Sequence, residues 1–439
     1  MPSDLRARLQ RLRLQKVKRE LPPASPAPRP PRAPAPALPG RAVTTRLGSF
    51  QLVESVYPLD YQHGPARFGD WLAHSPATAA LLARDETLVG SDLKSLAFID
   101  TETTGLAGGT GTLVFLVGAG VFDGDRFVLR QYFMRDPGEE EALLNALVAD
   151  LAARAGWVTF NGRSFDLPLL ETRLTLIGQR GALGQRPHLD LLPPARRLYQ
   201  RRLPSCKLGE IEHSVFKIIR EQDDVPGALI PQMYLDYLRT GDASDMRRVI
   251  YHNAIDILST VTLATHLLEV FATKLEPATS NFTLHTSPST YLQAANRSSP
   301  PGTSVLQPED LLRLAHWHDD NGRAAEAEAA YRRALEGELG LEARRAGLTR
   351  LAALLKRIDR RAEAAPLWEQ LASFTLDDPE PFVELAKFYE WHETDILQAA
   401  AWTRRALNVV NGWPRGWRRA EAVAALQHRL ERLNGKLKG

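Results

Sequence analysis

Runs of apolar residues in the middle of the chain predict a β-sheet. Three runs, Leu96–Asp100, Thr112–Phe122 and Arg126–Met134, are joined by short glycine-containing turns and predict an antiparallel meander. A helix is expected over Glu139–Ala155 because apolar and charged positions alternate there with helical spacing. The strand that follows it, Gly156–Asn161, is expected to lie parallel within the same sheet, as crossover connections do. The pattern predicts a mixed α/β domain.

This domain is expected over residues 95–275, with a folded extension packed on it at 46–94. Residues 276–304 are rich in Ser, Thr and Pro and are typical of a linker. Residues 305–436 are alanine-rich and predicted to be helical. A fold class of α/β with a C-terminal all-α domain follows.

The helical region contains three similar segments, Leu311–Leu335, Leu348–Leu371 and Phe382–Leu407. The second half of each carries an aromatic residue, and these residues (Tyr331, Trp368, Trp402) are 37 and 34 positions apart. This period resembles tetratricopeptide repeats, in which helix pairs stack on one another. A non-repetitive helical bundle is the alternative. Such repeats would serve a protein partner or self-association.

Positive charge is concentrated at the N-terminus. Residues 1–48 contain 11 Lys/Arg and 2 Asp/Glu, whereas the remainder contains 44 basic and 50 acidic residues. Nine prolines fall between residues 21 and 40, so we predict a disordered basic tail over 1–45. Such a tail contacts nucleic acid or simply keeps the protein soluble, and both interpretations remain open.

Composition narrows the class of protein. At 439 residues, the chain is too long for one compact core. The single cysteine, Cys206, excludes an intrachain disulfide framework and a cysteine-rich zinc site. The most apolar run, Leu113–Phe122, is too short to span a membrane, and the basic N-terminus lacks the apolar segment of a secretory signal. We therefore expect a cytoplasmic protein without a membrane partner.

Two carboxylates end the first predicted strand. Asp100 and Glu102 are two positions apart, so their side chains project from the same face of the sheet. Carboxylates this close repel each other unless a cation lies between them. On its own, such a pair is more often a solvated strand end than a metal site.

Further candidates follow in the sequence. Asp166 lies just beyond the turn after the fourth strand, where it is expected beside the first strand's end; an ordinary helix N-terminal acid is the alternative. His252 and Asp256 are four residues apart on a predicted helix at Ala243–Phe271 and share one of its faces. A surface His–Asp pair would have the same spacing.

Together, the three segments resemble the motifs of the DEDD 3′–5′ exonucleases of the ribonuclease H-like superfamily. The Asp100-Thr-Glu-Thr-Thr-Gly-Leu106, Cys206-Lys-Leu-Gly-Glu210 and Asp223-Asp-Val-Pro-Gly-Ala228 stretches look most like the YprB-type branch of that family. The resemblance implies a mixed five-stranded sheet flanked by helices. It also implies that the four metal-binding carboxylates are those of Asp100, Glu102, Asp166 and Asp256.

The chain departs from this family at the fifth catalytic position. The family has a Tyr separated from the last Asp by three residues, or a His separated by four. Here His252 has the tyrosine-type spacing and Tyr251 the histidine-type spacing. A residue four positions back faces Asp256, whereas one five back points about 100° away. We therefore predict that His252 is the base or water-orienting group.

Four carboxylates form a hard-oxygen site that suits Mg²⁺ or Mn²⁺. Two such ions, ~4 Å apart, hold the attacking and leaving oxygens of a phosphodiester during hydrolysis, and an imidazole accepts the proton of the attacking water. We therefore predict a metal-dependent exonuclease acting on nucleic acid, with single-stranded 3′ ends as its substrate. The alternative is a catalytically inactive nucleic-acid-binding or scaffold protein that acts through its helical repeats.

Overall fold

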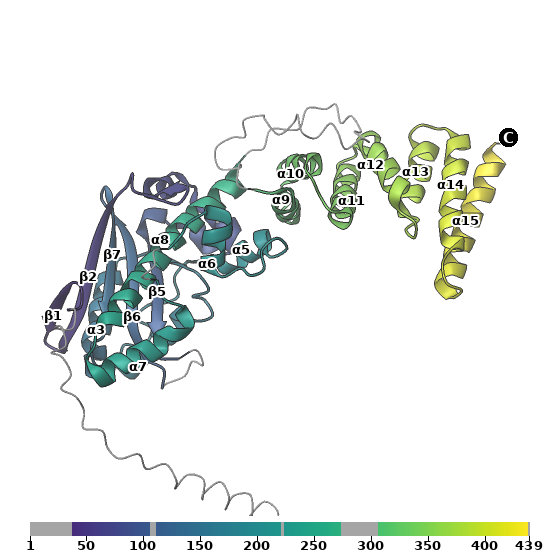
Figure 1. The fold of residues 1–439 in the computed structure, drawn as a ribbon. Helices are drawn as coiled ribbons and strands as arrows, with labels where there is room; N and C mark the ends of the chain where they lie inside the picture. The colour runs from purple at the N-terminus through teal and green to yellow at the C-terminus, as the bar shows by residue number, and fades with distance from the viewer. Residues whose placement is uncertain (1–36, 106–110, 221–223, 274–305, 438–439) are drawn as a thin grey trace, which may run out of the picture.

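The computed structural model describes residues 37–105, 111–220, 224–273 and 306–437. A sheet domain at the N-terminal side is followed by an array of helices at the C-terminal side (Figure 1). Most of the predicted basic tail and nearly all of the predicted linker lie outside the described residues.

The first domain is built on one mixed sheet of seven strands in the order β1-β2-β7-β6-β5-β8-β9. The predicted meander is confirmed, since β5, β6 and β7 pair antiparallel in sequence order. The fourth predicted strand is also confirmed, since β8 runs parallel to β5, and β9 then runs parallel to β8. The strands are β1 Arg41–Thr45, β2 Gly48–Pro58, β5 Leu96–Thr103, β6 Val114–Asp123, β7 Arg126–Phe133, β8 Gly156–Thr159 and β9 His188–Asp190, and a separate small hairpin is formed by β3 Gln62–His63 and β4 Ala66–Arg67.

Two predictions about this sheet need correction. The sheet has seven strands rather than five, and the chain is already a strand at β1, inside the segment expected to be a disordered tail. The extension is also part of the sheet, because β2 pairs with β7 from Gln51 to Pro58. Beyond the buried Phe50 and Leu52, β2 is partly exposed on one side, so its polar and apolar residues alternate and no continuous apolar run reveals it.

Helices cover the sheet and bury two apolar clusters, one on each face. Neighbouring residues of β5 alternate between them: Phe98 belongs to one cluster, and Ala97 and Ile99 to the other. The longest helix, α8, crosses the sheet in Figure 1 and contributes to both clusters. The helices of this domain are α2 Pro76–Ala83, α3 Glu140–Leu151, α4 Asp166–Leu176, α5 Leu192–Tyr199, α6 Leu208–Ile211, α7 Ile230–Thr240 and α8 Ser244–Ala272.

Helix α8 shows that Leu113–Phe122 is not the only segment that bears on the expectation of no membrane partner. Its 29 residues are long and apolar enough to cross a membrane by length and composition. However, 78% of its most apolar window is buried inside the protein. This burial is that of a core helix, and it explains the apolar composition without a membrane.

The C-terminal region is all α-helical, as predicted. Three helix pairs stack in sequence order, and a last helix, α15, packs on α14 (Figure 1). Tyr331, Trp368 and Trp402 each lie on the second helix of a pair, at equivalent places in the predicted repeat. The helices are α9 Pro308–Asp320, α10 Ala324–Glu336, α11 Leu341–Arg357, α12 Arg361–Phe374, α13 Glu380–Trp391, α14 Ile396–Asn411 and α15 Trp417–Lys436.

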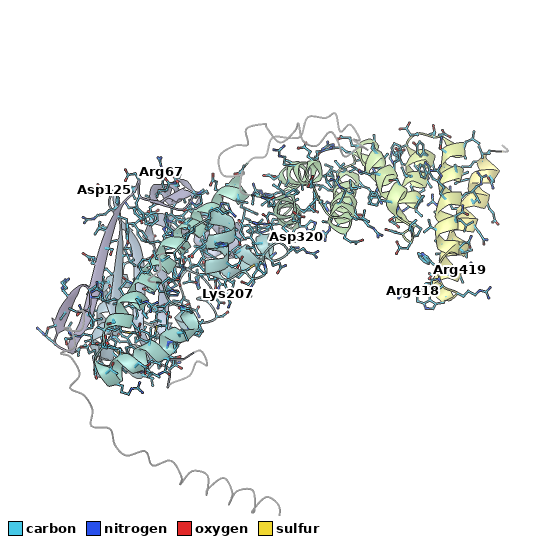
Figure 2. The ribbon with its side chains drawn as sticks, viewed as in Figure 1. Arg67, Asp125, Lys207, Asp320, Arg418 and Arg419 are labelled. Carbon is cyan, nitrogen blue, oxygen red and sulfur yellow. The ribbon has the colours of Figure 1, made fainter. Side chains whose placement is uncertain are left out.

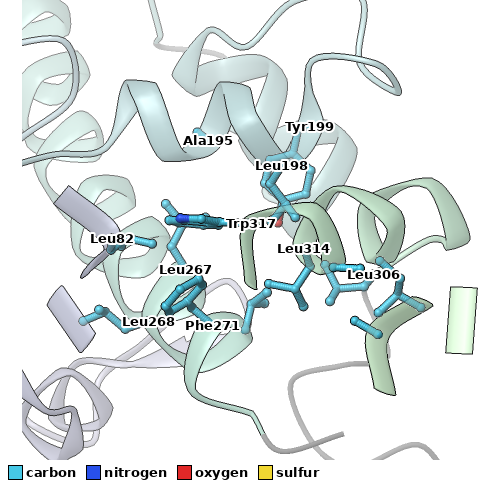
Figure 3. Close-up of a cluster of buried hydrophobic side chains, with 14 of the residues drawn as sticks. Leu82, Ala195, Leu198, Tyr199, Leu267, Leu268, Phe271, Leu306, Leu314 and Trp317 are labelled. Atoms are coloured by element: carbon cyan, nitrogen blue, oxygen red, sulfur yellow. The ribbon is translucent and has the colours of Figure 1, made fainter. Parts of the chain in front are cut away.

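The two regions share one hydrophobic cluster where α9 meets the sheet domain (Figure 3). The rings of Phe271 at the end of α8 and Trp317 of α9 are 4.3 Å apart between centroids. A buried ion pair lies nearby, in which Arg202 Nε is 2.9 Å from a carboxylate oxygen of Asp310. The array therefore packs directly against the sheet domain, through an apolar cluster with an ion pair next to it.

Candidate active site

The C-terminal end of β5 places Asp100 and Glu102 on one face of the sheet, as their spacing predicts. Both are half-buried. Asp100 pairs in register with Gly118 of β6. A Cβ atom added at Gly118 would lie 2.5 Å from the Asn253 side-chain oxygen, so only glycine lets α8 pass this close to the strand. The glycine brings α8 next to Asp100.

A chain of buried amide groups connects Asp100 to α8. The Asn253 side-chain amide donates to an Asp100 carboxylate oxygen at 2.8 Å. Gln131 of β7 in turn donates to the Asn253 side-chain oxygen at 2.9 Å and to the Ile250 carbonyl at 2.7 Å. Asn253 and Gln131 are almost completely buried. These bonds fix the orientation of the Asp100 carboxylate.

Asp166 is the first residue of α4, and a tight turn after β8 positions it. Asn161 in this turn has a φ of 71°, a left-handed conformation that Asn tolerates better than most residues. Asp190, at the end of β9, accepts hydrogen bonds from the backbone amides of Asn161 (2.8 Å) and Arg163 (3.0 Å). The Thr101 hydroxyl donates to the buried Asp166 carboxylate at 2.5 Å. Asp166 is thereby held next to the end of β5.

The fourth carboxylate, Asp256 of α8, is paired with an arginine that the sequence analysis did not single out. Arg220 contacts Asp256 through one guanidinium nitrogen. Its Nε and Nη2 atoms lie 2.6 and 2.7 Å from the two oxygens of Glu212, a bidentate pair. Asp224 lies 3.5 Å from Nη1 of the same guanidinium. Arg220 is therefore surrounded by three carboxylates.

His252 lies one helical turn before Asp256 and faces the same cluster. Its Nδ1 atom is 2.6 Å from an oxygen of Asp224, and its Nε2 atom is 3.5 Å from an oxygen of Asp256. The same Nδ1 atom also lies 3.2 Å from Nη1 of Arg220, so His252 is in contact with both Asp224 and Arg220. Tyr251, the alternative candidate, is rotated by about 100° around the helix from this direction.

The electrostatics show that these carboxylates are crowded. Burial raises the pKa of Asp100 well above its usual range, and repulsion by Asp256, Asp166 and Glu102 raises it further. Burial likewise raises the pKa of Glu102, followed by repulsion from Asp256 and Asp166. Burial lifts the pKa of Asp166 to about 6, although the Thr101 hydrogen bond opposes the shift. Burial also raises the pKa of Asp256. Asp100 and Glu102 therefore lie close enough to Asp166 and Asp256 to be repelled by both.

The residues present fit a divalent metal ion in kind, although not as a preformed cage. Within residues 37–105, 111–220, 224–273 and 306–437, no group of three or more His, Cys, Asp or Glu side chains is arranged to hold an ion. The reason is visible in their partners: Asp256 is turned to Arg220, Asp166 to Thr101 and Asp100 to Asn253. Negatively charged oxygen donors are nevertheless the ligands that Mg²⁺ or Mn²⁺ prefers.

Sequence reasoning missed five polar residues of this site: Gln131, Glu212, Arg220, Asp224 and Asn253. Glu212 lies in a short helical turn directly after α6, and Arg220 and Asp224 lie in the irregular chain before α7, where no helical or strand periodicity marks a position. Asn253 had a usable signal, because an amide so close to His252 and Asp256 on the buried side of a helix requires a partner.

Comparison with known proteins agrees with this fold. Residues 97–268 match the RNase_H superfamily, a range from β5 to near the end of α8. A protein of Bacillus subtilis (strain 168), named uncharacterized protein YprB, is 28% identical over 365 residues, which cover 81% of this chain and 79% of that protein. Residues 97–268 thus form a ribonuclease H superfamily domain. Such domains are generally nucleases that use divalent metal ions, so nucleic acid is the indicated class of substrate.

Proposed function

We propose that the protein is a divalent-metal-dependent exonuclease that removes nucleotides from single-stranded 3′ ends. One observation supports the proposal: burial raises the pKa values of Asp100, Glu102, Asp166 and Asp256, and repulsion by Asp256 and Asp166 raises those of Asp100 and Glu102 further. Such crowding destabilises the folded protein, so it has no structural benefit of its own. It is explained if the site binds cations during its reaction.

The four carboxylates would hold two metal ions. When bound, such ions polarise a phosphodiester and activate the attacking water. The side chains already provide part of the required arrangement, because Asn253 orients Asp100 and Thr101 orients Asp166. Asp256 is the ligand that must exchange its partner, since it now contacts Arg220.

His252 would accept the proton of the attacking water. Its Nε2 atom faces the carboxylate cluster, and its Nδ1 atom is bound to Asp224. Asp224 acts as a positioning residue, because a carboxylate on Nδ1 fixes the ring orientation and tautomer. This pairing of His252 with Asp224 is a further reason to prefer His252 over Tyr251 as the fifth catalytic residue.

Arg220 would balance the charge of the cluster between reaction cycles. Burial opposes its charge, yet contacts with Glu212 and Asp256 raise its pKa, so it remains a cation at every physiological pH. Glu212 holds the guanidinium through two oxygens, so Arg220 stays close to the site after Asp256 turns to a metal ion. From this place it would contact a substrate phosphate.

The direct test is digestion of 3′-labelled and 5′-labelled single strands of DNA and RNA with Mn²⁺, Mg²⁺ or EDTA. The wild type is expected to shorten strands one nucleotide at a time from the 3′ end, and EDTA is expected to abolish cleavage. Asp100→Asn should reduce the rate by about 10³-fold, since a metal ligand contributes several kcal/mol. Asp125→Asn is the control, because Asp125 is exposed at the β6–β7 turn (Figure 2).

Two results would count against the proposal. If neither metal supports cleavage of either nucleic acid, the protein acts as a nucleic-acid-binding or scaffold protein through its helical array. If internal fragments appear before terminal nucleotides, the enzyme is an endonuclease and the exonuclease assignment is wrong.

A further inference from the structure

The last two helices of the array and the turn between them form a basic surface. Residues 402–437 contain eight Lys/Arg and two Asp/Glu. Five of the basic residues form what is called here the arginine surface: Arg404 and Arg405 of α14, Arg415 of the turn, and Arg418 and Arg419 at the beginning of α15. Figure 2 labels the last two at the end of the array that lies away from the sheet domain.

These arginines have no carboxylate partner, unlike most arginines on the array. In the part of the chain that the structure describes, none of the five has a carboxylate within 4.0 Å. Many other arginines on the array are paired with carboxylates, as Arg333 is with Glu336 at 2.9 Å, whereas Arg313 and Arg344 donate to backbone carbonyls instead. The three remaining basic residues of α15, Arg429, Arg432 and Lys436, all converge on Glu390 of α13. Apart from a 3.4 Å hydrogen bond that Arg419 donates to the Trp413 carbonyl, the positive charge of the arginine surface is therefore not used to hold the fold together.

Aromatic rings lie among the arginines. Trp417 is 72% exposed, an unusual state for a tryptophan, and the guanidinium of Arg418 lies 5.4 Å from its ring centroid. Arg405 lies over Trp402 at 4.4 Å. A guanidinium stacked on a ring leaves its N–H groups free for an anion, while the open face of the ring accepts a flat apolar group.

We infer that the arginine surface binds single-stranded nucleic acid and holds the part of the strand that extends beyond the active site. The inference rests on the proposed nuclease function for its choice of ligand. Charge selects the ligand class, since unpaired arginines bind phosphates. The exposed Trp417 selects single strands, because only unpaired bases can stack on a side chain. The ribonuclease H-like domain supplies the catalytic site, and the array supplies a second contact on the same strand.

Other occupants fit less well. A second copy of the same surface would place arginines against arginines, which repel. An acidic protein segment would satisfy the charges but would leave Trp417 without a base to stack on, and its affinity would not depend on that ring. Nucleic acid satisfies both features at once.

The experiment measures binding of a fluorescent single strand of about 30 nucleotides to the full-length protein in EDTA, so that no cleavage occurs. Arg415→Gln with Arg418→Gln removes two exposed cations. Arg333→Gln with Arg361→Gln removes two cations from the same array that are paired with Glu336 and Asp359. A third variant, Trp417→Ala, removes the exposed ring.

The arginine-surface variant is expected to bind about 25-fold more weakly at 0.1 M salt, and the slope of log affinity against log salt should decrease by about 1.4, because each phosphate contact on a single strand contributes about 0.7. The paired-arginine control should bind as the wild type does. Trp417→Ala should lose about tenfold in affinity with an unchanged salt slope, since stacking is worth roughly 1–3 kcal/mol per base.

The inference is overturned if the arginine-surface variant and the control bind alike. It is also overturned if Trp417→Ala has no effect while polyglutamate competes as well as the oligonucleotide, since the surface would then bind any polyanion.

A cleavage assay separates this outcome from failure of the proposed function. The arginine-surface variant should cleave a dinucleotide at the wild-type rate but long strands more slowly, whereas a wild type that cleaves neither refutes the nuclease proposal and leaves the binding result standing.

Discussion

The active site and the junction of α13 with α15 treat buried carboxylates in opposite ways. At the junction, Glu390 is buried among Arg429, Arg432 and Lys436. Burial opposes ionisation of Glu390, but the Arg432 and Lys436 contacts prevail and lower its pKa to about 2. In the active site the pKa values of four carboxylates are raised. Glu390 is thus paired with three cations, whereas Asp256 of the active site is paired with one arginine, Arg220.

This difference separates structural charge from functional charge. A carboxylate surrounded by cations stabilises the folded state, and neutralising it should weaken the protein. Carboxylates that repel one another weaken the folded state, and neutralising one should strengthen the protein while abolishing its reaction. The comparison therefore makes predictions with opposite signs for the two regions.

After the loss expected for Asp100→Asn, the next largest effect on the cleavage rate is expected at His252, which serves the reaction without belonging to the crowded carboxylates. His252→Gln should reduce the cleavage rate by about 100-fold, because loss of a general base typically removes this factor or more. Asp224→Asn should reduce it by about tenfold, since the ring would lose its orienting partner. Single-turnover digestion of a 3′-labelled strand measures both rates.

Tyr251→Phe is the matched control for this prediction, and its rate should stay within about threefold of the wild type, as loss of a hydroxyl outside the reaction leaves the barrier nearly unchanged. Equal losses in His252→Gln and Tyr251→Phe would mean that helical geometry chose the wrong fifth residue. Circular dichroism shows whether either variant is misfolded.

The two regions also differ in how much of each could be predicted from the sequence. Local periodicity placed Asp100 and Glu102 on one face of a strand and His252 and Asp256 on one face of a helix, whereas the assignment of four metal-binding carboxylates came from the family resemblance and stays a prediction. The crossover rule correctly placed the strand before Asp166 parallel to β5. The cations could not be predicted, since Arg220 reaches Asp256 across 36 positions from an irregular segment. Glu390 and Lys436 are likewise 46 positions apart.

The strands that were not predicted from the sequence were missed for a similar reason. Strand β2 pairs with β7, which is far away in sequence, and its one exposed side interrupts the apolar pattern. Pairing with a distant partner is decided by the whole sheet rather than by local residues. The helical array was easier to predict from the sequence, because each helix pair repeats a local pattern with one aromatic residue in its second helix.

The second prediction concerns the structural carboxylate. A decrease in pKa from 4.5 to about 2 corresponds to at most roughly 3 kcal/mol, and screening of the half-exposed Arg432 and Lys436 reduces this to about 2 kcal/mol. Glu390→Gln should therefore lower the free energy of unfolding by about 2 kcal/mol, measured by urea denaturation at pH 7. Glu393→Gln, at an exposed position in the next turn, should change it little.

The pH dependence of this difference follows from its sign. Because folding lowers the pKa of Glu390, its stabilisation is complete above pH 4.5 and is lost as the pH falls toward about 2. The gap between wild type and Glu390→Gln should be the same at pH 7 and pH 5 and smaller at pH 3. A gap that grows in acid would show that Glu390 is not stabilised by its cations.

The smallest effect, and the one of opposite sign, is expected for Asp100→Asn in EDTA. The asparagine retains an oxygen that accepts the hydrogen bond from Asn253, but it removes one charge from the cluster. We expect the free energy of unfolding to rise by about 1 kcal/mol at pH 8, since repulsion and burial of the charge are both relieved. Folding raises the pKa of Asp100, so this gain should shrink as the pH falls. Asp125→Asn should show no gain.

Addition of Mn²⁺ should reverse the order of stability, because the wild type is stabilised by the ion it binds and the Asp100→Asn variant binds it more weakly. Should Asp100→Asn be less stable than the wild type in EDTA, Asp100 would be a structural carboxylate like Glu390, and the distinction between the two regions would fail.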